Sequence, residues 1–117
     1  SPRSRYRNAY INYKFLKNTK NLLCIGLKDE FQDLKKDIND LEFHDCKDLL
    51  EMAEIIKASK FYIGSMSPQH IIAEALKVPR LLEASPVFPI VFPIGPKAFD
   101  AYHQNHFEKF FKELNKL

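Results

Sequence analysis

The sequence lacks any apolar run that approaches the roughly 20 residues needed to span a membrane, and no signal peptide leads it. We therefore expect a cytoplasmic protein without a membrane span. The chain begins with Ser1 rather than Met, which indicates a piece of a longer protein. With 117 residues, of which 45% are hydrophobic, the chain can bury one real core, but a second full domain will not fit.

Cysteine is scarce. The chain has two, Cys24 and Cys46, and they show neither a CxxC pair nor another metal-ligand spacing, so we expect two reduced thiols. His103 and His106 form a single HxxH pair without a third ligand at a suitable spacing. A surface helix explains that pair better than a metal site, and we expect neither a metal nor a cofactor.

Acidic residues are missing from the first 28 positions, which carry seven basic residues: Arg3, Arg5, Arg7, Lys14, Lys17, Lys20 and Lys28. The remainder holds 11 basic and 15 acidic residues. This asymmetry indicates that one end of the chain meets anions. We interpret residues 1–20 as an irregular basic arm, which is either a solvated terminal segment or a phosphate-contacting loop. Interleaved Arg and Tyr would also suit single-stranded nucleic acid, but no RNA-binding signature follows.

Several familiar catalytic motifs are also absent. The sequence contains no GxGxxG fingerprint and no P-loop, which argues against classical dinucleotide binding and ATP hydrolysis. No Ser-His-Asp or Cys-His constellation can be assembled with any specificity. No acidic cluster follows the apolar run at residues 21–27, which disfavours a regulatory domain of the response-regulator shape.

Apolar runs and helical periods alternate along residues 21–117, with links of a few residues. We predict strands at 21–27, 41–44, 60–63 and 80–82, and helices capped by Asp29, Asp48, Ser67 and Asn105. The first strand should be buried on both faces, and the apolar stripe of residues 49–56 should be core. This order predicts a single Rossmann-like α/β domain over residues 21–117, with three layers and a mostly parallel sheet of about four strands.

Residues 85–96 interrupt the alternation with a tandem Val-Phe-Pro-Ile repeat. Proline removes ladder donors and holds its predecessor extended, so we predict an ordered apolar loop rather than a central strand. Phe88 and Phe92 should pack back on the domain, which we favour, or else line a pocket or meet a partner domain.

The stretch from Lys60 to Glu83 is the candidate functional centre. A strand ends at Gly64, and Ser67 and Pro68 suit the N-cap and first position of the next helix. A helix that begins just past a strand's carboxyl end directs N–H groups and its positive dipole end into the crevice above the sheet, where phosphate binds readily. We therefore predict a ligand-binding turn at Gly64, Ser65, Ser67 and Gln69.

His70 and Glu74 are spaced i, i+4 and share one face of this helix. The pair is either an ion pair on a solvated face or a set of ligand contacts, because His70 lies in the first turn beside the crevice. We carry both residues as candidate ligand-binding residues.

Residues 48–83, DLLEMAEIIKASKFYIGSMSPQHIIAEALKVPRLLE, resemble the carboxyl-terminal half of GT-B glycosyltransferases of the heptosyltransferase type, which are glycosyltransferase family 9-like. The matching positions are Gly64, Ser67, Pro68, His70, Ala73, Ala75, Leu76, Val78 and Pro79. Met66 stands at the acidic position of the family motif, and the second glycine of that motif is missing. The strong part of the resemblance covers about a third of the chain.

The resemblance implies a nucleoside-diphosphate sugar as ligand, with its diphosphate at the turn and helix start and Arg5 and Arg7 facing the same phosphates. It also implies a separate amino-terminal half of the same protein, which supplies acceptor binding and the catalytic base. With that half present, a hexosyl or heptosyl group would pass to an acceptor glycan or lipid-linked glycan. The alternative is a non-catalytic α/β interaction domain that binds a protein or nucleic acid through its basic arm or its Val-Phe-Pro-Ile loop.

Overall fold

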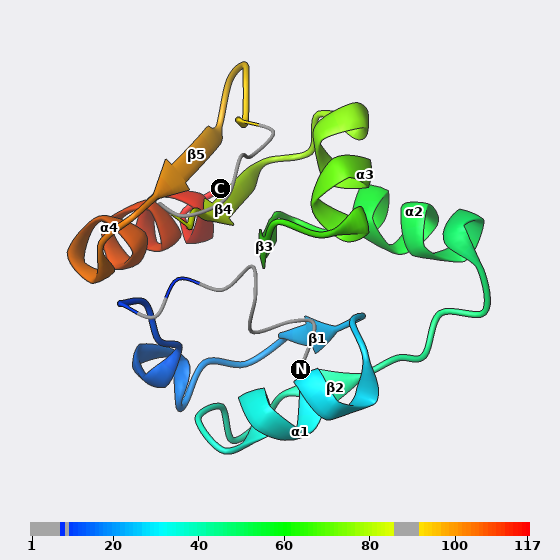
Figure 1. Ribbon diagram of the computed structural model, residues 1–117, viewed down its shortest axis with the longest axis horizontal. Helices are drawn as coiled ribbons and strands as arrows, with labels where there is room; N and C mark the ends of the chain where they lie inside the picture. Colours follow the sequence, from blue (N-terminus) through cyan, green and yellow to red (C-terminus); the bar gives the residue numbers. More distant parts are fainter. Residues whose placement is uncertain (1–7, 9, 86–91) are drawn as a thin grey trace. The chain divides into compact units, whose positions relative to one another are not determined.

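The computed structural model describes residue 8, residues 10–85 and residues 92–117. The chain forms two compact units: residues 1–11 with 53–117, here called the large unit, and residues 12–52, the small unit. The elements run in the order η2 (Lys14–Leu16), β1 (Leu23–Cys24), α1 (Lys28–Lys35), β2 (Glu42–Phe43), α2 (Leu49–Ala58), β3 (Tyr62–Ser65), α3 (Pro68–Leu76), β4 (Arg80–Glu83), β5 (Ala98–Ala101) and α4 (Gln104–Asn115) (Figure 1).

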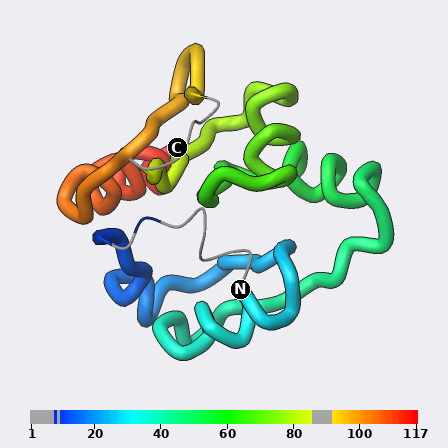
Figure 2. The backbone as a smooth tube through the Cα atoms, viewed as in Figure 1, coloured from blue at the N-terminus to red at the C-terminus, as the bar shows by residue number. Residues whose placement is uncertain are grey.

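The large unit is built on a three-stranded sheet in the order β3-β4-β5. All its pairs are parallel, and the register aligns Ser65 with Glu83 and Glu83 with Ala101, so the carboxyl ends of the strands are level. The tube in Figure 2 follows the chain from β3 through α3 into β4, which is a βαβ unit. The predicted α/β class with parallel strands and flanking helices is confirmed.

The two faces of this sheet carry different helices. Strand residues alternate between faces, so Tyr62, Gly64 and Arg80 share one face, whereas Ile63, Leu81 and Phe99 share the other. Arg80 reaches Glu74 of α3 from the first face. On the second, Phe99 stacks on Phe110 of α4 with ring centroids 4.6 Å apart. Helices α3 and α4 therefore cover opposite faces, which gives this unit three layers.

The core of the large unit lies between these layers. Its buried apolar side chains are Ile56, Ala73, Val78, Leu81, Leu82, Ala84, Ala101, Phe107, Phe111 and Leu114. Strand β5 was not among the predicted strands, because Ala98–Ala101 has no long apolar run. Helix α4 begins at Gln104, one residue before the predicted cap, and its phenylalanines point into this core as the helical spacing predicts.

The small unit contains one short parallel pair, β1 with β2. The prediction of a strand buried on both faces at residues 21–27 is wrong: β1 has two residues, and the exposed fractions of Leu23 and Leu27 are 46% and 60%. Paired with β2 alone among the described residues, β1 is not an interior strand of a wide sheet. Ile38 and Leu41, which follow helix α1, are buried instead.

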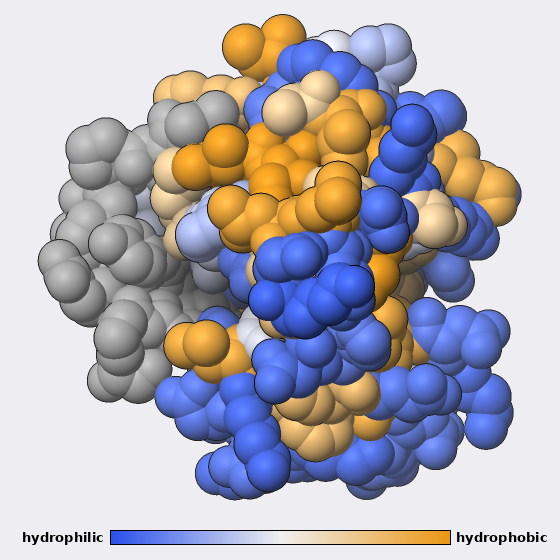
Figure 3. All heavy atoms as spheres, turned by 90° about the vertical axis from the view of Figure 1, so that its right-hand side faces the viewer, coloured by the Kyte–Doolittle hydropathy of each residue, from blue (hydrophilic) through white to orange (hydrophobic). Residues whose placement is uncertain are grey.

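Helix α2 begins as predicted, because Asp48 Oδ1 accepts the N–H of Glu51 at 2.8 Å. Its apolar stripe, however, is only partly core. Ile56 is 2% exposed, whereas Leu49 is 65% and Leu50 69% exposed. Figure 3 shows that hydrophobic side chains are exposed among hydrophilic ones on the face that it presents. No helix within residues 10–85 and 92–117 combines the length and apolarity that a membrane span requires.

Candidate functional site

The turn after β3 has the predicted helix start. Ser67 has extended backbone angles, and its Oγ accepts the N–H of His70 at 3.3 Å, while Pro68 takes the first helical position. The first N–H groups of a helix lack acceptors within it. Pro68 has no N–H and the N–H of His70 is capped, so Ser67 and Gln69 supply the other N–H groups at this helix start.

Gly64 is required by its neighbour on the same face of the strand. A Cβ at position 64 would lie 2.0 Å from the hydroxyl of Tyr62 and 2.6 Å from its Cζ. The Tyr62 ring therefore passes over Gly64, and its Oη comes within 3.4 Å of Ser67 Oγ. The sequence analysis missed Tyr62, although the i, i+2 spacing of a strand places it on the same face as Gly64.

Glu74 is held by Arg80 rather than by His70. Arg80 donates from Nε to Glu74 Oε1 at 3.0 Å and from Nη2 to Oε2 at 2.9 Å, and Lys77 pairs with the same carboxylate. The guanidinium is fully buried and also donates to the carbonyl oxygens of Val78 and Ile94, at 2.8 and 2.6 Å. This network joins α3, β4 and the segment before β5.

These bonds set the charge of the Glu74 carboxyl. Burial by itself would raise its pKa, but the hydrogen bonds from Lys77 and Arg80, with the charge of Arg80, hold the pKa below its ordinary value. Glu74 therefore stays ionised at neutral pH, and it acts on the site indirectly by holding α3 against β4.

His70 is fully buried in the first turn of α3. The alternative that placed it in an ion pair on a solvated face is therefore wrong. Glu74 is also shielded, with 13% of its side chain exposed, because Arg80 lies against it. The His70 side chain is therefore buried within the fold, in the same helical turn that Ser67 caps and that contains Gln69.

Asn8, within the basic arm, is anchored at the carboxyl ends of two strands. The backbone N–H of Asn8 donates to Glu83 Oε1 at 2.9 Å, and Asn8 Nδ2 donates to the carbonyl oxygens of Ala84 and Tyr102, both at 2.8 Å. Asn8 is 2% exposed and Glu83 is fully buried. Asn8 thus ties together the chain after β4 and the chain after β5, and the sequence analysis assigned it no role.

Two predicted arginines, Arg5 and Arg7, lie outside the described residues, as does Phe88. Phe92 is described, and the favoured prediction that it packs back on the domain is wrong, because 54% of it is exposed. Ile94 is 69% exposed, although its backbone N–H donates to Glu74 at 3.3 Å. The end of the Val-Phe-Pro-Ile repeat is therefore anchored through its backbone and presents its side chains outward.

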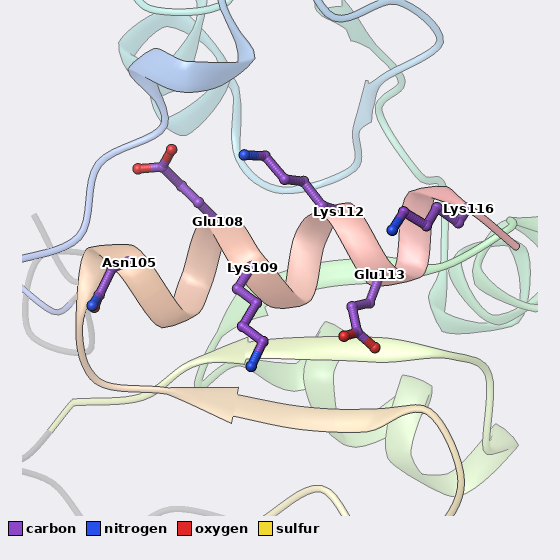
Figure 4. A pocket seen from close by; sticks show the side chains of 6 residues that line it. All are labelled: Asn105, Glu108, Lys109, Lys112, Glu113 and Lys116. Carbon is purple, nitrogen blue, oxygen red and sulfur yellow. The ribbon is translucent and has the colours of Figure 1, made fainter.

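Two further groups of polar side chains lie on or beside helix α4. His103 and His106 are exposed, with ring centroids 6.1 Å apart. A pocket along α4 is lined by Asn105, Glu108, Lys109, Lys112, Glu113 and Lys116 (Figure 4). Three lysines, two glutamates and one asparagine line it, and none of the predicted site residues does. The predicted site therefore remains the turn between β3 and α3.

Comparison of the chain with protein-family models, with curated proteins and with solved structures gave no match.

Proposed function

We propose that the large unit binds the diphosphate of a nucleoside-diphosphate sugar at the carboxyl ends of β3, β4 and β5, as the donor-binding part of a glycosyltransferase. The observation that carries the proposal is the anchoring of Asn8. It attaches one residue of the basic arm to the same sheet edge at which α3 begins. A helix N-terminus at the carboxyl edge of a parallel sheet suits an anionic ligand. Arg5 and Arg7 precede Asn8 in the sequence and would add positive charge.

Each candidate residue has a distinct role in this proposal. The N–H groups of Ser67 and Gln69 donate to phosphate oxygens, and Ser65, which ends β3, offers a hydroxyl to the same ligand. Arg5 and Arg7, three positions and one position before Asn8, supply positive charge. Gly64 leaves room for the Tyr62 ring at the end of β3, and the buried His70 supports the first turn of α3. Glu74 holds α3 in place through its hydrogen bonds with Arg80.

These groups would act on the bond that breaks. Sugar transfer cleaves the bond between the anomeric carbon and the diphosphate oxygen, so negative charge grows on the departing nucleoside diphosphate. Fixed N–H donors and arginines stabilise that charge without reorganising. The acceptor, an alcohol of a glycan or lipid-linked glycan, would lose its proton to a base on the amino-terminal half of the protein. The chain alone is expected to bind the donor without turnover.

An amide chemical-shift titration with nucleoside diphosphates and their sugars tests this function. We expect saturable shifts at Gly64–His70 for one nucleotide. The double variant R5Q/R7Q should weaken binding at least tenfold, or about 1.4 kcal/mol. The matched control K14Q/K17Q removes the same charge from elsewhere and should change affinity much less. Absent shifts, or equal losses in the two double variants, would refute the proposal.

The exposure of Phe92 and Ile94 favours a second candidate, the non-catalytic interaction domain. Exposed apolar side chains held on an anchored backbone are typical of protein contacts. This candidate predicts that a protein partner is retained by the wild-type chain and lost by the F92S/I94S double variant, while nucleotide titrations leave Gly64–His70 unshifted. Nucleotide binding there together with unchanged partner capture by F92S/I94S would reject it.

A further inference from the structure

A mixed set of metal-binding side chains lies in the small unit, apart from the residues considered above. Residues 44–48 link β2 to α2, and Glu51 lies in the first turn of α2. Both ends of the stretch from His44 to Glu51 are fixed. The N–H of His44 donates to the carbonyl oxygen of Cys24 at 3.0 Å, which continues the β1–β2 ladder. At the other end, Asp48 caps Glu51 at 2.8 Å. Hydrogen bonds therefore fix the backbone of this short stretch at both ends.

The loop brings three different donors together. A ring nitrogen of His44, Sγ of Cys46 and a carboxylate oxygen of Glu51 all lie within 4.8 Å of one another. His44 Nε2 is 2.5 Å from Glu51 Oε1. An imidazole, a thiol and a carboxylate are ligands that Zn²⁺ accepts in one site. In the sequence these residues form the pattern H-x-C-x₄-E, which lacks the CxxC spacing that usually signals zinc.

We propose that His44, Cys46 and Glu51 bind a Zn²⁺ ion. Three protein ligands leave a fourth tetrahedral position for water or another ligand. Zinc–ligand bonds of about 2.0–2.3 Å require donor atoms roughly 3–4 Å apart. Small side-chain rotations must therefore separate His44 Nε2 from Glu51 Oε1, now 2.5 Å apart, and adjust Cys46 Sγ to both. His44 is 46% exposed and Glu51 24%, which leaves space for these rotations.

The charge around the loop favours a cation. Besides Glu51, two further carboxylates, those of Asp45 and Asp48, lie within two positions of Cys46 in the sequence. Lys47 is the lysine among residues 44–51. A divalent ion would relieve the repulsion between these carboxylates and would replace the proton on the thiol. Without the ion, the same geometry would be a plain hydrogen bond between His44 and Glu51, and the experiment has to separate these two states.

Titration of the reduced chain with Co²⁺, a coloured substitute for zinc, makes the separation. A thiolate–cobalt charge-transfer band should appear and saturate at one equivalent, and Zn²⁺ should abolish it. The matched variants are C46S and C24S, because the chain has only these two cysteines. The band should vanish in C46S and persist in C24S. No band in the wild type, a band in C46S, or its loss in C24S would overturn the proposal.

Variants of the other two ligands, and of the histidine pair at positions 103 and 106, complete the test. H44N and E51Q should each weaken Zn²⁺ binding at least tenfold in a competition titration. H103N/H106N should leave both band and affinity unchanged, and a loss of binding there would move the ion to that pair and refute our assignment. Amide spectra of each metal-free variant that match the wild type will show that the fold is kept. Unchanged affinity in H44N and E51Q would also refute the site.

Discussion

The backbone N–H of Asn8 and the carboxylate of Glu83 are joined by a hydrogen bond of 2.9 Å between residues 75 positions apart. Both residues are buried, and Glu83 ends strand β4. The bond fixes Asn8 of the basic arm at the carboxyl edge of the sheet. Any role of the arm in anion binding depends on this attachment, so its strength can be tested separately from ligand binding.

Replacing Asn8 with alanine should destabilise the large unit by about 2–3 kcal/mol. The variant keeps the backbone bond to Glu83 but loses the side-chain bonds to Ala84, Tyr102 and Tyr10, each worth about 1 kcal/mol. Urea unfolding gives the free-energy difference. Asn105→Ala is the matched control, because its exposed side chain caps only the adjacent N–H of His106. A loss no greater than in this control would show that the arm is not anchored through Asn8.

Gly64→Ala should cost about 1–3 kcal/mol, because the new Cβ would lie 2.0 Å from the Tyr62 hydroxyl and the ring must move. The clash also involves Cζ at 2.6 Å, so Tyr62→Phe should not relieve it, whereas Tyr62→Ala should. A double-mutant cycle between positions 62 and 64 measures this coupling. Additive losses would contradict the packing of the ring over Gly64.

Ser67→Ala should lower stability by about 1 kcal/mol, because the N–H of His70 loses its cap. Ser67→Asp retains a capping oxygen and should stay near the wild type in thermal unfolding. The aspartate also places a negative charge at the proposed phosphate site, so it should bind nucleotide more weakly than Ser67→Ala does. Equal stability of all three proteins would reject the cap.

Glu74→Gln should destabilise the chain by about 3 kcal/mol at neutral pH, because it leaves the buried Arg80 charge without its partner. The folded-state pKa of Glu74 lies below its ordinary value of 4.5, so the carboxylate stabilises the fold above that pH. That stability is lost as the pH falls through the lowered folded-state pKa. The gap between wild type and variant should therefore be widest at pH 7 and narrow below about pH 4.5.

Denaturant unfolding at a series of pH values measures this gap. Glu54→Gln, on the exposed face of α2, is the matched control and should differ little from the wild type at any pH. A gap for Glu74→Gln that stays constant into acid would contradict an ionised Glu74 paired with Arg80.

Local chemistry explains what could be predicted. The predicted start of α3 was correct to the residue, because an N-cap serine and a following proline fix a helix start through contacts within one turn. The prediction of the parallel α/β class was correct, because strands that alternate with helices are joined by crossover connections, which make the strands parallel. The partner of Glu74 was not predicted, because helical spacing suggests His70 on the same helix, whereas the folded chain supplies Arg80 from the next strand.

The sequence by itself determined where strands and helices alternate and where α3 begins, since each depends on neighbouring residues. Tertiary structure decided the rest. It left β1 exposed in a two-stranded pair, brought Asn8 to Glu83, laid Tyr62 over Gly64, and gathered His44, Cys46 and Glu51. Burial and hydrogen bonds between residues that share no local sequence pattern depend on how the helices and strands pack. That packing cannot be deduced from the periodicity of neighbouring residues.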